Sequence, residues 1–135
     1  MAKESGLGWT TLEVDDATPT ARDIKNDVTN LEFATPRAVQ ETTGVDKFAM
    51  ERLLLLADYS VTLNGVFNDA SNQSHDVLKT VCSATVTRTV KLVVSGNTLQ
   101  NECLITDYNL TRADSGELTW TAPGVLQDGT APTWT

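Results

Sequence analysis

Residues 42–78 read TTGVDKFAMERLLLLADYSVTLNGVFNDASNQSHDVL, and the clearest element in this stretch is a strand over 59–67. Apolar and polar residues alternate there with a period of two, which is typical of a half-buried strand. One face carries Tyr59, Val61, Leu63 and Phe67, and the other carries Ser60, Thr62 and Asn64. Gly65 lies on the apolar face, where we expect a bulge or a close neighbour. The pattern indicates a sheet with one buried face.

Short helices are expected on both sides of this strand. Asp46 is a suitable N-cap for a helix over 47–54, and Ser74 is a suitable N-cap for a helix over 75–81. In the second helix Val77, Leu78 and Val81 would face inward. The intervening residues 68–73 are rich in Asn, Asp and Ser, which favours a polar loop.

The rest of the chain predicts mostly strands and turns. Strands are expected over 9–14, 28–33, 37–42, 84–94, 98–111 and 117–121, with turns at 95–97 and 114–116. Residues 22–26 are polar and ambiguous, and 123–135 form a turn-rich tail. Apolar residues occur on both faces of the strand at 98–111. We therefore expect a second sheet to cover one face and another subunit to cover the other. We therefore expect a mainly β protein, a β-sandwich or open barrel with one or two short helices, as a single domain over 1–135.

Composition narrows the function classes. The net charge is -8 and the sequence pI is near 4.4, while the ten Lys and Arg residues are scattered without a basic stripe. A sequence-specific nucleic-acid binder would need clustered cations, because phosphate contacts dominate its affinity. The excess of acidic residues has two interpretations. It keeps the protein soluble, or it forms an acidic surface that repels DNA and lets DNA slide past. No apolar run approaches the roughly 20 residues of a membrane helix, and the N-terminus lacks the apolar core of a signal peptide, so we expect synthesis in the cytosol.

Motifs for catalysis or metal binding are not found in the sequence. It contains no Gly-rich phosphate loop, no GxSxG and no HExxH. His75, the single histidine, is expected to be a solvent-facing helix residue, since neighbours in sequence on a helix do not face each other. Cys82 and Cys103 lack metal-site spacing, so we expect two buried free thiols, with a disulfide between neighbouring strands as the alternative. We therefore expect no enzyme activity, no cofactor and no metal.

Four segments, taken in order, resemble the tail-tube (major tail) proteins of long-tailed bacteriophages. The first is RAVQETTGVD at 37–46, and the second is MERLLLLADYSVTL at 50–63. The third is GVFND at 65–69 followed by SHDVL at 74–78, and the fourth is LTWTAP at 118–123. Each segment is a soft pattern, and the specificity lies in their order.

This resemblance implies a structural virion protein. Its subunits would join edge strands into a closed ring, commonly hexameric, with a β-barrel lumen, and the rings would stack into a tube through which DNA passes without specific binding. The implied partners are further copies of the chain and the tape-measure, tail-terminator and tail-tip proteins, with no membrane. The location would be the virion tail, and the host cytoplasm during assembly.

The resemblance also suggests contact residues. A long loop often bridges rings in this family, and by position it would span 35–47, with Arg37, Glu41, Asp46 and Lys47 as inter-ring or inter-subunit contacts. The candidates for acidic lumen or interface charges are Asp15, Asp16 and Glu102, although the Asp15–Asp16 pair would equally suit a turn.

Two other classes compete with a tube protein. A small β-sandwich binding module, such as a capsid decoration or carbohydrate- or receptor-binding protein, would group exposed aromatic residues on one rim, with Trp9, Trp120 and Trp134 as candidates. An enzyme or enzyme inhibitor is the third class, and it is disfavoured because no catalytic constellation is present. Size discriminates among them, because a tube protein forms rings or polymers.

Overall fold

The computed structural model describes residues 3–135, which form one long antiparallel sheet, a separate two-stranded hairpin and one short helix. The long sheet has eight strands in the order β2-β1-β7-β8-β10-β6-β3, with β9 also paired to β10. Its strands are β1 (Trp9–Asp15), β2 (Ala21–Asp23), β3 (Val28–Ala34), β6 (Ser60–Val66), β7 (Arg88–Val94), β8 (Asn97–Ile105), β9 (Asn109–Arg112) and β10 (Leu118–Leu126). The hairpin consists of β4 (Arg37–Glu41) and β5 (Arg52–Ala57), and the helix is α1 (Ser74–Leu78).

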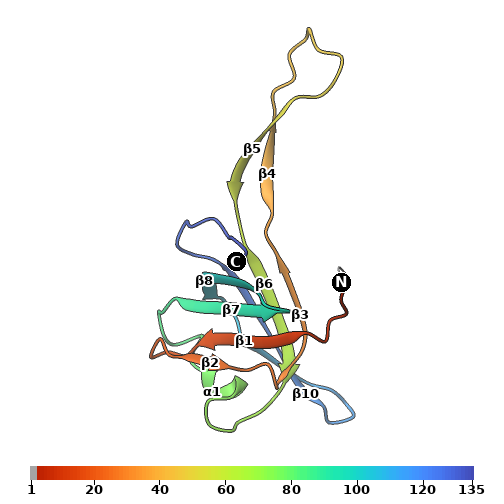
Figure 1. Cartoon of the computed structure of the whole chain (residues 1–135). Helices are drawn as coiled ribbons and strands as arrows, with labels where there is room; N and C mark the ends of the chain where they lie inside the picture. Colours follow the sequence, from red (N-terminus) through yellow and green to blue (C-terminus); the bar gives the residue numbers. More distant parts are fainter. Residues whose placement is uncertain (1–2) are drawn as a thin grey trace.

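The long sheet folds over on itself around a single apolar core. Figure 1 shows β1, β2, β7 and β8 crossing β3, β6 and β10 at a steep angle. Core side chains come from both groups and from α1, including Leu12, Leu63, Val77, Leu92 and Trp120. Among the described residues β1 and β3 do not pair through their backbones, so the barrel is open on this side. The expected β-sandwich or open barrel is confirmed.

The strand predicted over 59–67 is confirmed as β6. Tyr59, Val61 and Leu63 are fully buried, and the intervening residues point outward. Gly65 does have a close neighbour, because a Cβ there would meet the carbonyl oxygen of Asp27 and lie 2.6 Å from the Trp120 ring. The Trp120 indole donates a hydrogen bond to the Val66 carbonyl at 2.8 Å. Glycine is therefore required at this position by the close approach of the Asp27 backbone and of Trp120 on β10.

The helix predicted over 47–54 is wrong. Residues 42–51 form the loop of the hairpin, and 52–57 form β5, which pairs with β4 in the register Val39↔Leu54 and Glu41↔Arg52. The apolar residues of this segment lack a helical period, so no single helix face would collect them. As a strand, the same residues satisfy their backbone groups through the partner strand.

The second helix is confirmed in position but not in its cap. It spans Ser74–Leu78, its N-cap is Gln73, and no N-cap side chain bonds to the helix. The Asp27 carboxylate, which is buried, instead accepts hydrogen bonds from the Ser74 amide at 2.9 Å and the Asn68 side chain at 2.8 Å. The carboxylate of Asp27 thus binds the first backbone amide of α1, at the end of the helix where the helix dipole favours negative charge.

A buried cation holds the other end of α1. The Arg88 guanidinium is 1% exposed and donates to the carbonyl oxygens of Val77 at 2.8 Å and Asp15 at 2.9 Å, and to the Thr80 hydroxyl at 3.0 Å. Burial lowers the pKa of Arg88, and the charges of Asp16 and Asp15 oppose that shift. Arg88 therefore joins the end of α1 to the end of β1.

Several strand boundaries differ from the prediction. The strand expected from residue 84 begins at Arg88, and residues 21–23 form the short strand β2. The strand expected over 98–111 divides into β8 and β9, which pair with successive parts of β10. Strand β10 continues through Pro123 to Leu126, so the tail begins later than expected. The turn after β7 is confirmed, with positive φ at Ser95 and Gly96 as a tight hairpin requires.

Candidate assembly interface

The β4–β5 hairpin projects from the sandwich as an arm, which we define as residues 37–57 (Figure 1). It continues the pairing of β3 with β6, and the Asp58 amide bonds to the Pro36 carbonyl at 2.9 Å where the two ribbons join. The Arg37 guanidinium donates to the Leu55 carbonyl at 2.8 and 3.1 Å, across the irregular register of the hairpin. The arm is thus a direct extension of two strands of the long sheet.

The loop at the tip of the arm is ordered by its own polar groups. The Thr43 hydroxyl accepts a hydrogen bond from the Glu51 amide at 2.9 Å, and the Thr42 amide donates to the Glu51 carbonyl at 2.9 Å. Lys47 lies 3.6 Å from carboxylate oxygens of both Asp46 and Glu51. These contacts leave the apolar side chains of the loop directed outward.

The arm is apolar on both of its faces. Its exposed large hydrophobic residues are Val39, Val45, Phe48, Met50, Leu53, Leu54, Leu55 and Leu56. Val45 and Phe48 are fully exposed, and Leu56 is 88% exposed. Consecutive residues of a strand point to opposite faces, so the four leucines make both sides of β5 apolar. Monomeric soluble proteins rarely expose a large apolar surface of this kind, and such surfaces are candidates for interaction sites.

All four predicted contact residues lie on the arm, but they are spread along its length. Arg37 and Glu41 lie on β4, and Asp46 and Lys47 lie in the tip loop. Arg37 is engaged within the arm itself, and contacts of the four residues with another subunit remain a prediction. Sequence reasoning missed the leucines of β5 as interface residues because the run at 53–56 was assigned to a helix. Read as a strand, an unbroken apolar run signals two covered faces.

The acidic candidates separate into two places. Asp15 and Glu102 converge on Thr89 of β7: the Thr89 amide donates to Asp15 at 3.2 Å, and its hydroxyl donates to Glu102 at 2.8 Å. These carboxylates lie on the outer face of β1, β7 and β8, together with Glu13 and Lys91. A position in a lumen or interface stays a prediction for both residues.

Asp16 serves the loop that follows β1. Its carboxylate accepts hydrogen bonds from the Thr18 hydroxyl at 2.6 Å, from the Thr18 and Thr20 amides, and from the Arg22 side chain at 3.1 Å. These contacts, the Thr18 hydroxyl first among them, hold the pKa of Asp16 well below its ordinary value. Of the two roles predicted for the Asp15–Asp16 pair, the role in a turn is therefore the one that Asp16 has.

His75 and Cys82 differ from their predictions, whereas Cys103 agrees with its prediction. The His75 ring is packed rather than solvent-facing: its Nδ1 lies 3.1 Å from the Tyr108 hydroxyl, and its centroid lies 4.7 Å from that of Phe67. Cys103 is buried as expected, and burial raises its pKa to about 12, whereas Cys82 is exposed. Both thiols are free. Within residues 3–135 no three His, Cys, Asp or Glu side chains are grouped to hold a metal ion, and no described helix is long and apolar enough to span a membrane.

The aromatic candidates are partly grouped. Trp9 and Trp134 both pack against Phe33, with ring centroids 6.3 and 5.8 Å apart, at the open side of the barrel. Trp120 is buried in the core. Two of the three tryptophans thus share one site with Phe33.

Comparison with solved structures locates this fold among virion components. The chain matches a chain in the virion of a native gene transfer agent particle with a TM-score of 0.75 and 15% identity, covering 98% of this chain and 99% of that chain. It also matches a chain in the tail of an empty particle, solved with C6 symmetry, with a TM-score of 0.73, 15% identity and the same coverage. The chain has the fold of a gene transfer agent tail component. No protein-family model and no curated protein matches the sequence.

Proposed function

We propose that the protein is a structural subunit of a phage-like virion tail, and that its copies form rings that stack into the tail tube. The observation that carries this proposal is the match over 98% of the chain to a component of a tail with C6 symmetry. Because both chains are covered almost completely, the likeness includes the arm as well as the sandwich. Six copies in each ring would follow from the same symmetry.

Free strand edges support assembly into a ring. Within the described residues β2 ends the long sheet with one paired side, and β9, which pairs only with β10, is a second free edge. Exposed edges are prone to pair with other chains, and a closed ring of subunits removes them. The apolar arm adds a second unsatisfied surface, which a neighbouring ring would cover. The protein thus has one kind of surface for closing a ring and another for stacking.

The charge of the chain suits passage of DNA without binding. With a net charge of -8 and scattered cations, the protein offers phosphate groups little attraction. A tube built from it would let a genome slide through its channel. The proposal gives the chain no catalytic role and no cofactor, and it names tape-measure, terminator and tip proteins as partners at the ends of the tube. Its location would be the virion tail, after assembly in the host cytoplasm.

The test is assembly, measured by light scattering and negative-stain electron microscopy of the purified protein at high concentration, with and without a tail-tip complex. We expect rings or hollow tubes with six-fold end views. The double variant Val45→Ser, Phe48→Ser removes exposed apolar groups from the arm, so its monomer should be unchanged in stability while its tubes are lost. Monomers in both conditions for the unmodified protein would refute the proposal and favour a small binding module.

A further inference from the structure

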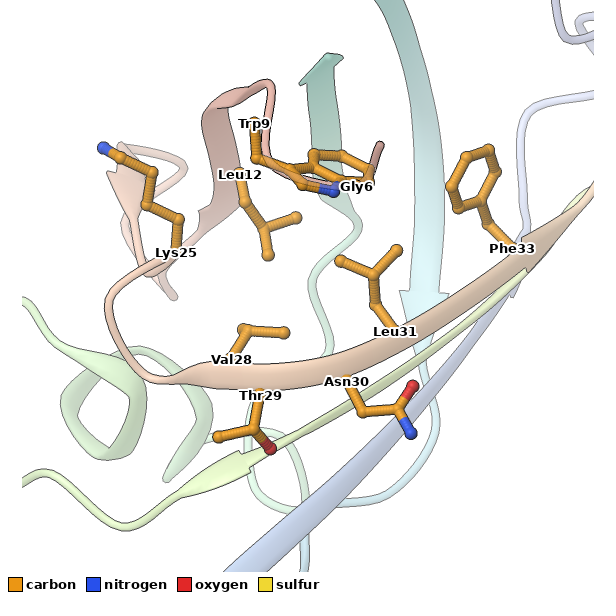
Figure 2. A pocket seen from close by; sticks show the side chains of 9 residues that line it. All are labelled: Gly6, Trp9, Leu12, Lys25, Val28, Thr29, Asn30, Leu31 and Phe33. Carbon is orange, nitrogen blue, oxygen red and sulfur yellow. The ribbon is translucent and has the colours of Figure 1, made fainter. Parts of the chain in front are cut away.

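The open side of the barrel forms a slot between β1 and β3, with an inner wall of apolar side chains and polar groups from Lys25, Thr29 and Asn30. Its volume is about 470 Å³, and it is lined chiefly by Trp9, Leu12, Lys25, Val28, Leu31 and Phe33. Figure 2 shows Leu12, Val28 and Leu31 directed into this space, with Lys25 at one end and Phe33 at the other. Thr29 and Asn30 also contribute to the lining, but their side chains point to the opposite side of β3. We call this space the β1–β3 slot.

The slot exists because two edges of the sheet face each other without pairing. Strand β3 pairs with β6 on one side only. Strand β1 pairs with β7 from Trp9 to Val14, and on its other side β2 reaches only Glu13–Asp15. Among residues 3–135 no strand fills the gap. Trp9, Val28, Leu31 and Phe33 therefore remain only partly buried, although they pack against the core. An apolar group from outside would complete their burial.

The arm of the same chain cannot fill this slot. The arm begins where β3 ends and extends away from the sandwich (Figure 1), and its paired strands keep it from folding back. Five extended residues of β4 alone span roughly 17 Å. Val45 and Phe48 at the tip are therefore held far from their own slot, but they can reach a second molecule.

We propose that the tip of the arm of one copy docks in the β1–β3 slot of a second copy, with Phe48 as the anchor. Phe48 is a single, fully exposed aromatic side chain, and the slot offers the rings of Trp9 and Phe33 for edge contacts. A buried aromatic anchor in an apolar pocket is the usual centre of a strong interface. Because arm and slot are different surfaces, the contact repeats head to tail and builds rings or stacks rather than isolated dimers. The inference rests on the proposed tail function, and it specifies where the arm binds.

Cysteine cross-linking tests the contact directly. The exposed Cys82 is first replaced by Ser, which leaves the buried Cys103. One batch then carries Val45→Cys, which keeps Phe48 at the tip of the arm, and a second batch carries Leu31→Cys. The two batches are mixed under mild oxidation. We expect a disulfide-linked species that joins one chain of each batch. The matched control replaces Leu31→Cys by Asn30→Cys, one residue away but on the other side of β3 (Figure 2). Equal or stronger cross-linking with the control overturns the proposal.

A second pair of variants measures the same contact without thiols. Leu31→Arg places a charge in the slot, and Asn30→Arg places the same charge on a side chain that points to the other side of β3. We expect Leu31→Arg to raise the protein concentration needed for assembly by roughly tenfold or more, while Asn30→Arg leaves it nearly unchanged. Melting curves identify any loss of folding in Leu31→Arg, and in that case the cross-linking result decides.

The outcomes separate this inference from the proposed function. Tubes that form without the Val45–Leu31 cross-link would overturn the docking site and leave the tail function standing. A cross-link in species that never build rings or tubes would support the docking site and count against the tail function. Absence of both would refute both.

Discussion

Replacement of glycine by alanine at three positions tests how tightly β6 and β10 pack. At Gly65 the new methyl group would meet the Asp27 carbonyl and two Trp120 ring atoms, at 2.6 and 2.8 Å. At Gly124 it would meet the ends of the Ile105 and Val61 side chains at 3.0 Å, and at Gly6 it would meet nothing within 4 Å. The added methyl group thus meets rigid neighbours at Gly65, movable side-chain ends at Gly124 and no neighbour at Gly6.

The expected loss of stability follows from these contacts. Overpacking a filled core costs about 1–3 kcal/mol, and Gly65→Ala should lie at the upper end because a backbone carbonyl and a buried indole cannot move independently. The lower unfolded-state entropy of alanine offsets about 0.5–1 kcal/mol of that cost. We therefore expect a net loss of about 2 kcal/mol for Gly65→Ala, less than about 1 kcal/mol for Gly124→Ala, and a change within about 0.5 kcal/mol for Gly6→Ala.

Urea unfolding of the monomer, followed by tryptophan fluorescence and circular dichroism, measures these differences. The hydrogen bond from Trp120 to Val66 should weaken in Gly65→Ala, and the fluorescence of the folded state should shift accordingly. If Gly65→Ala is as stable as Gly6→Ala, then Trp120 does not press on Gly65 and the packing argument is refuted.

Two further substitutions and one labelling experiment probe other parts of the molecule. Arg88→Met removes the donors to two buried carbonyl oxygens and should lower the free energy of unfolding by about 2–4 kcal/mol. Thermal unfolding measures this loss. An unchanged melting temperature would contradict the role of Arg88 in holding α1. In the native protein a thiol reagent should modify Cys82 quickly and Cys103 only on unfolding, since the Cys103 thiol is buried and its pKa is raised; two fast thiols would show that the β8 core is open. Asp16 has a lowered pKa in the folded state, so its charge stabilises the protein above its ordinary pKa of 3.8 and this contribution is lost as pH falls further. Asp16→Asn should therefore be less stable than the unmodified protein at neutral pH, and the gap should narrow below about pH 4; a gap that stays constant down to acid pH would contradict this assignment.

The elements read most accurately from the sequence are those whose local pattern and tertiary environment agree. The alternation over 59–67 predicts β6 because each apolar residue has a core to enter, and the Ser95–Gly96 turn follows from local backbone preference. The acidic charge and the scattered cations likewise required no structure for their interpretation. These properties depend on neighbours in the sequence or on the whole composition.

The arm shows where such reasoning fails. The leucine run at 53–56 is apolar in every position, so it carries no period that separates helix from strand, and only its pairing with β4 resolved the choice. The start of α1 was assigned to a local cap, whereas the structure uses Asp27, 47 residues away from Ser74. Long-range partners of this kind leave no signal in the local sequence.

Sequence alone thus established a mainly β chain with an acidic surface, a strand at 59–67 and no pattern for catalysis, since composition and a period of two suffice for these. Tertiary structure alone established the projecting arm, the open β1–β3 slot, the convergence of Asp15 and Glu102 on Thr89, and the buried charges at the two ends of α1. The physical reason is that each of these features depends on which strands become neighbours. That choice is made by burial and backbone pairing summed over the whole fold, and no short segment contains it.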